Sequence, residues 1–280
     1  MGNLNGKCSS GRLRITGQLI EAATGEHLPE NLDGYDSALQ ALALLNKGTV
    51  DNLYEAIRCL EKAIQLAPNY ALAYAMTAYA YGRLYVAGAN VDLENERLKA
   101  VNFARKSIEL SGDDPEVLAY ATFALGNLEG DVSALVERCV SLNPNLAFGW
   151  FMLGSDKLYR GDYDQALEYL ARALRLSPIG GNARTGAMAS SALAYLLSNR
   201  VEQAYLWAER AYQEDPDNAY PLRVLAMSAA AAGHRSRAYA LFQRFAPAAP
   251  KYLERMKFMM GASKDYQKIV EAMRLASMPD

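Results

Sequence analysis

Residues 150–178, WFMLGSDKLYRGDYDQALEYLARALRLSP, decide the fold. The apolar and small positions fall on two helical faces: Trp150, Leu153 and Gly154 on the first, and Ala166, Leu170 and Ala173 on the second. Gly161 and Asp162 lie between them, where the chain is expected to reverse. Because Gly154 and Ala166 lack bulk, they allow two helix backbones to approach closely. The stretch predicts a helix–turn–helix hairpin with apolar surface on both sides.

Read as W-x2-LG, then GD, then A-x3-L-x2-A and a closing Pro, these residues resemble the tetratricopeptide (TPR) repeat. A single hairpin of this kind is not stable alone and must be stacked between copies of itself. The resemblance implies an all-α fold, a right-handed TPR superhelix. Trp150 is expected to fill the wedge between neighbouring helices.

The same spacing of small residues and closing turns recurs along the chain. It predicts six repeats and a C-terminal cap, at residues 35–68, 69–112, 113–144, 145–178, 182–216, 217–250 and 251–276. The second repeat is lengthened by an insertion, VAGANVDLENE, at residues 86–96. Because nothing stacks on a terminal repeat, the charged residues of the cap, Arg255 among them, are expected on a polar outer face.

The first 32 residues have a different pattern. Leu13, Ile15, Gly17 and Leu19 alternate with the period of a strand, which predicts a short β-prone arm before a TPR domain of residues 33–280. Residues 14–28, RITGQLIEAATGEHL, and 30–49, ENLDGYDSALQALALLNKGT, resemble the junction between a TolB-like α/β domain and the TPR array of bacterial regulators. Those regulators carry a class III adenylate/guanylate cyclase domain or a winged-helix DNA-binding domain upstream. The resemblance implies that the arm is a remnant of the TolB-like domain.

Composition narrows the class of protein. The chain has 280 residues, of which 51% are hydrophobic and 21% charged, so it is expected to fold. No apolar run approaches the roughly 20 residues of a membrane span, and no secretory signal is seen. The net charge of −2 does not favour nucleic acid. Three unevenly spaced cysteines, Cys8, Cys59 and Cys139, favour neither a disulfide framework nor a zinc site, and Cys59 and Cys139 are expected to be buried thiols in a reducing cytoplasm.

No group of residues predicts a catalytic, cofactor or metal site. His27 and His234 are far apart, and neither has the spacing that would place two imidazoles on one helical face. Gly180 lies in a loop without a phosphate-binding motif around it. Carboxylates such as Asp51 and Asp162 are expected to cap helix starts.

The binding candidates lie on the first helix of each repeat, which lines the concave groove of a TPR superhelix. The candidates are Tyr79, Arg83, Phe123, Asn127, Phe151, Ser155, Tyr159, Tyr220, Arg223 and Met227. Interfaces concentrate Tyr, Phe, Arg and Met. Two alternatives remain open: Phe123 and Phe151 as core residues, and Arg83 and Arg223 as ordinary solvated surface.

These observations predict a non-enzymatic interaction or regulatory scaffold that binds a peptide or partner domain in the groove. Homo-oligomerisation is compatible with the sequence. The lysine, asparagine and arginine clamp for chaperone carboxyl termini is disfavoured, because the corresponding positions are Ala75, Tyr79, Ala119 and Phe123. The alternatives are a C-terminal regulatory fragment of an adenylate/guanylate cyclase-like protein and the TPR portion of a winged-helix transcription regulator.

Overall fold

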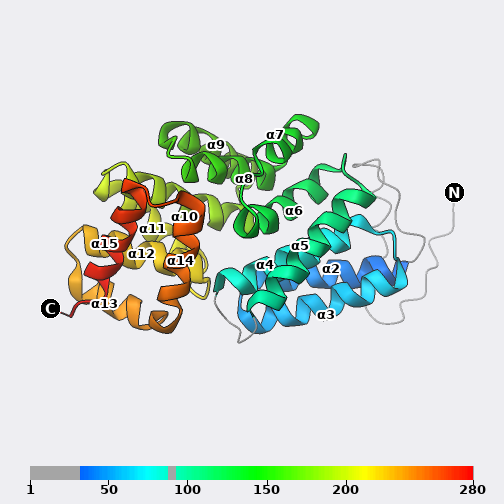
Figure 1. The fold of residues 1–280 in the computed structure, drawn as a ribbon, viewed down its shortest axis with the longest axis horizontal. Coiled ribbons are helices and arrows are strands. Elements are labelled where there is room, and N and C mark those ends of the chain that lie inside the picture. Colours follow the sequence, from blue (N-terminus) through cyan, green and yellow to red (C-terminus); the bar gives the residue numbers. More distant parts are fainter. Residues whose placement is uncertain (1–31, 88–92, 280) are drawn as a thin grey trace, which may run out of the picture.

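The structure, a computed structural model, describes residues 32–87 and 93–279. Within this part of the chain, fourteen α-helices and one short 3-10 helix are present, and no strand (Figure 1). The predicted β-prone arm lies outside the described residues, apart from Leu32, which begins the first described helix. The division of the chain after residue 32 therefore stays a prediction.

The helices follow one another as hairpins. Six successive pairs are α2 (Leu32–Lys47) with α3 (Val50–Leu66), α4 (Ala71–Ala87) with α5 (Leu93–Leu110), α6 (Pro115–Leu128) with α7 (Ser133–Leu142), α8 (Ala147–Tyr159) with α9 (Tyr163–Leu176), α10 (Asn182–Leu197) with α11 (Val201–Glu214), and α12 (Ala219–Ala231) with α13 (Arg235–Gln243). A turn, η1 (Ala246–Ala248), leads to the last pair, α14 (Ala249–Met260) with α15 (Lys264–Ala276). This arrangement confirms the predicted superhelix of about six hairpins with a capping pair.

The α8–α9 hairpin shows why the small residues recur. Ala166, Leu170 and Ala173 are fully buried, and a Cβ placed on Gly154 would lie 2.7 Å from Leu170 Cγ and 3.2 Å from the Ala166 carbonyl oxygen. Only glycine allows the two backbones to come this close. Trp150 is buried as expected, with its Nε1 donating to the Pro144 carbonyl at 2.8 Å.

Polar side chains begin several helices. Asp162 Oδ1 accepts from the backbone N–H of Gln165 at the start of α9. The prediction for Asp51 was wrong: Thr49 is the N-cap of α3, with its Oγ1 accepting from Asn52 N at 3.3 Å. Asp51 lies in the first turn of α3, where its negative charge favours the helix dipole without capping.

The superhelix bends so strongly that helices from its C-terminal half contact helices from its N-terminal half. Helix α14 packs against α4, although most of the chain lies between them, and α10 approaches the end of α2 (Figure 1). None of the described helices is both long and apolar enough to cross a membrane.

Candidate functional site

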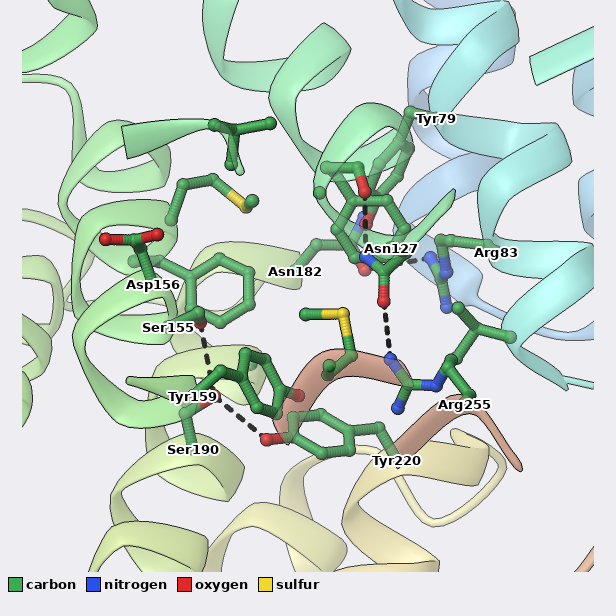
Figure 2. A pocket seen from close by; sticks show the side chains of 18 of the residues that line it. Tyr79, Arg83, Asn127, Ser155, Asp156, Tyr159, Asn182, Ser190, Tyr220 and Arg255 are labelled. Carbon is green, nitrogen blue, oxygen red and sulfur yellow. Dashed lines mark hydrogen bonds between the residues drawn. The ribbon is translucent and has the colours of Figure 1, made fainter. Parts of the chain in front are cut away.

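The first helices of the repeats enclose a chamber. Side chains from α4, α6, α8, α10 and α12, together with α14 from the last pair, surround a cavity of about 350 Å³ (Figure 2). Cavities of this size bind small ligands or short chain segments. We call this cavity the chamber.

Nine of the ten candidate residues line the chamber. They are Tyr79, Arg83, Phe123, Asn127, Phe151, Ser155, Tyr159, Tyr220 and Arg223. Met227 does not: it is fully buried in the packing of α12 and belongs to the core. Because side chains that the sequence spreads over almost 150 residues reach one space, the chamber is the candidate site of the described residues.

Aromatic rings form one wall. Tyr79 has its ring centroid 4.7 Å from that of Phe123 and 5.6 Å from that of Phe148, and Phe148 lies 5.6 Å from Phe151. A Cβ on Gly186 would lie 2.6 Å from Phe151 Cζ, so the backbone of α10 rests on this ring. The two open interpretations of Phe123 and Phe151 are therefore compatible, since both rings pack in the cluster and also line the chamber.

Arg83 joins the two ends of the bend. Its Nη1 donates to the Leu45 carbonyl at 2.9 Å and to Asn182 Oδ1 at 3.2 Å, and its Nη2 donates to the Gly48 carbonyl at 3.2 Å. Asn182 Nδ2 also donates to the Leu45 carbonyl, at 3.1 Å. The solvated alternative for Arg83 was wrong, because its guanidinium connects the end of α2 to the start of α10.

The alternative of Arg223 as ordinary solvated surface was also wrong. It is only 1% exposed, and its Nη1 and Nη2 donate to the carbonyls of Val86 and Ala87 at 2.9 and 3.0 Å. Carbonyls in the last turn of a helix lack partners within the helix and carry the negative end of its dipole, so they attract a cation. Burial, with a smaller effect from the charge of Arg255, lowers the pKa of Arg223 to about 10. The guanidinium therefore stays positive at neutral pH.

Arg255 faces inward, and the prediction of a polar outer face was wrong for it. It is 7% exposed, and its Nη1 donates to Asn127 Oδ1 (Figure 2). Tyr252 and Met256, on the same side of α14, are buried. Because Arg255 lies on an apolar face of its helix, the sequence contained a signal that this arginine points inward.

The chamber has an excess of positive charge. Four arginines and two aspartates line it, which gives a net charge of +2 in a chain whose total charge is −2. Both aspartates, Asp131 and Asp156, are already paired with Arg160. Hydrogen bonds from Ser133, followed by the charge of Arg160, lower the pKa of Asp131, so this pair stays ionised near neutral pH. The remaining arginines, Arg83, Arg223 and Arg255, make no ion pair with a carboxylate of the described residues.

Hydroxyl groups occupy the opposite side. Ser190 Oγ lies 3.0 Å from the Tyr220 hydroxyl and 3.5 Å from Ser155 Oγ (Figure 2). Burial raises the pKa of Tyr220 well above its usual value, so its phenol keeps its proton and can donate it in a hydrogen bond. Sequence reasoning missed Ser190, because it could not show that α10 turns this side chain toward Tyr220.

The chamber opens to solvent on one side. Phe258, which lines it, is 53% exposed, and the side chains of Asp131 and Arg160 are 73% and 46% exposed. We call these three residues the mouth. Among the residues that the structure describes, no group of three or more His, Cys, Asp or Glu side chains is placed to hold a metal ion.

Comparisons with known proteins agree with this architecture. Residues 37–70 and 147–179 each match a model described as the tetratricopeptide repeat. These two stretches therefore match single tetratricopeptide repeats, and the described helices stack as a TPR-like superhelix. The specific resemblance of the chain to TolB-linked regulators stays a prediction.

Individual relatives are distant. In structure, the chain is similar to a human IFIT1 dimer with m7Gppp-AAAA (16% identity, TM-score 0.62, 88% of this chain and 60% of that one). It is also similar to PilW, a type IV pilus biogenesis factor (18% identity, TM-score 0.50, 85% of this chain and 98% of that one). A third similar structure is TTC0263, a thermophilic TPR protein of Thermus thermophilus (17% identity, TM-score 0.51, 71% of this chain and 98% of that one). At these identities the likeness shows the fold alone. In sequence, 86 residues are 31% identical to the mouse protein O-mannosyl-transferase TMTC1, covering 29% of this chain and 9% of that protein's length.

Proposed function

We propose that this protein is a non-catalytic interaction protein that holds a short segment of a partner protein in the chamber. One observation carries the proposal: the side chains that stacking leaves free on five successive inner helices converge on a single space. Repeats of this class present their inner helices as a binding surface. Aromatic side chains and arginines are the residues that contribute most to protein interfaces.

The geometry favours a segment over a broad surface. Cross-turn contacts of Arg83 and Arg223 join the walls of the chamber, and we expect a partner to reach it through the mouth. A volume of about 350 Å³ holds a few residues of an extended chain and not a folded domain. A partner bound in this way would insert one end or one loop.

A regulatory role, a cytoplasmic location and a homo-oligomer stay predictions. The relation to cyclase-linked or winged-helix regulators rests on residues 14–49, whose first half lies outside the described residues. Sequence encoded upstream of residue 1 in the natural gene would test it.

A photo-crosslinking experiment tests the chamber as a binding site. The photoreactive amino acid p-benzoylphenylalanine replaces Tyr159 inside the chamber in one variant and Leu206, which is 58% exposed on α11, in another. We expect irradiation of cells to attach a defined peptide at position 159 and not at position 206, identified by mass spectrometry. The same products at both positions would contradict the proposal.

A further inference from the structure

Two arginines in the chamber are buried without a counter-charge. Arg223 is 1% exposed and Arg255 is 7% exposed, and neither forms an ion pair with a carboxylate of the described residues. Removing a charge from water is costly unless an opposite charge or hydrogen bonds replace the lost solvation. The Nε of each arginine is buried without a hydrogen-bond partner, so solvation is replaced only in part.

The ring of Tyr252 lies close to both cations. The guanidinium carbons of Arg223 and Arg255 are 5.2 and 5.6 Å from its centroid. Cation–π contacts offset part of the burial cost, but they add no negative charge. The two like charges also act on each other, since Arg255 contributes to the lowered pKa of Arg223. An arrangement of this kind is stabilised when an anion binds.

Arg255 offers a free donor to such an anion. Its Nη1 is used by Asn127, whereas its Nη2 makes no hydrogen bond to the described residues and points toward Tyr220 (Figure 2). The Tyr220 hydroxyl is bonded to Ser190 Oγ, and when Ser190 donates, the phenolic hydrogen is free. Two donors therefore line the chamber, one from α14 and one from α12.

The number of donors indicates the kind of anion. A carboxylate has two oxygens, which Arg255 Nη2 and the Tyr220 hydroxyl can each meet. A phosphate group presents three strongly accepting oxygens and needs further donors. The terminal nitrogens of Arg223 are committed to the carbonyls of Val86 and Ala87, so Arg223 contributes charge and not additional hydrogen bonds.

We propose that the chamber selects an acidic partner segment, one carboxylate of which binds Arg255 and Tyr220 next to Arg223. This inference rests on the proposed function and adds the chemistry of the partner. At the mouth, Arg160 offsets one of the two negative charges of Asp131 and Asp156, and the four arginines of the chamber still outnumber its two aspartates, so the chamber as a whole attracts a carboxylate. The aromatic wall around Tyr79 and Phe151 contacts the apolar neighbours of the acidic residue.

A peptide selection tests the acidic preference without a known partner. The full chain is used to select from a displayed library of random six-residue peptides. We expect the selected pool to be enriched in Asp or Glu at one position. A selected pool without this enrichment would overturn the acidic preference and leave peptide binding intact, whereas a failure to select any peptide would contradict both proposals.

Variants of Arg255 connect the preference to the site. We expect Arg255→Gln to weaken the selected acidic peptides at least tenfold and to abolish the Asp/Glu enrichment. Arg255→Lys keeps the charge and should keep the enrichment with weaker binding, which separates loss of charge from loss of fold. Arg58→Gln removes an exposed arginine on α3 and serves as the matched control, with no change expected. Equal binding by Arg255→Gln and wild type would refute the site.

The source of the carboxylate is read from synthetic versions of a selected peptide. One version has a free carboxyl terminus, a second is amidated, and a third has Asn or Gln in place of the acidic residue. Loss of binding on amidation assigns the carboxyl terminus to Arg255, and loss on side-chain replacement assigns the side chain. Retention of wild-type affinity by a peptide with both changes would contradict the proposal.

Discussion

Replacing Trp150 by alanine tests the packing that holds consecutive hairpins together. The indole is buried, and the guanidinium of Arg172 lies 3.9 Å from its centre. Truncating a buried tryptophan to alanine costs about 3–5 kcal/mol, because transfer free energy is lost and a cavity remains. Trp150→Phe keeps most of the ring and loses the hydrogen bond to the Pro144 carbonyl. Since Arg172 Nη2 also donates to that carbonyl, at 3.3 Å, the acceptor stays paired and the loss should be about 1 kcal/mol.

Thermal unfolding followed by circular dichroism measures both changes. For a chain of this size, we expect the midpoint to fall on the order of 10 °C in Trp150→Ala and by a few degrees in Trp150→Phe. Leu206→Ala, at a position that is 58% exposed, is the control and should change the stability by less than about 0.5 kcal/mol. If Trp150→Ala unfolds at the same temperature as this control, the stacking argument is refuted.

Two further predictions concern close packing. Gly154→Leu should lower the free energy of unfolding in urea by about 1–3 kcal/mol, because its Cβ would lie 2.7 Å from Leu170 Cγ. In Gly34→Ala, the new Cβ meets atoms no nearer than 3.4 Å, so this variant should gain up to about 1 kcal/mol of stability from helix propensity. Stabilisation by both changes would contradict this contrast. Burial raises the pKa of the fully buried Cys139 to about 12, so below that pH its thiol stays protonated. At pH 8 iodoacetamide should therefore modify the half-buried Cys59 before Cys139, and mass spectrometry showing Cys139 modified before Cys59 would contradict this burial.

The repeat architecture could be predicted because its signal is local. Gly154, Ala166 and Leu170 meet within one hairpin of 30 residues, and the same spacing returns in each repeat. Stacking then follows from apolar surface on both sides of every hairpin. The inner position of Tyr79, Asn127 and most other candidates follows from the same register.

The chamber could not be predicted, because it depends on the curvature summed over all the repeats. A small rotation at each interface decides whether Arg223 reaches solvent or the last carbonyls of α4, and no residue pattern reports that sum. Arg255 was assigned to the outer face because a terminal helix usually needs one. Here α14 folds back over the concave side, so its polar residue enters the interior.

The contacts of Arg83, Arg223 and Arg255 across the bend change how a repeat array behaves as a whole. In an open solenoid, each unit touches only its neighbours, and the ends can fray independently. Here hydrogen bonds connect residues 128 to 137 positions apart, from Asn127 to Arg255 and from Leu45 to Asn182. Such pairs raise the contact order, and their loop-closure entropy must be overcome after the helices have formed. Folding should therefore end in a slow step in which these distant helices come together. The helices at the two ends of the array should lose their protection against amide hydrogen exchange together.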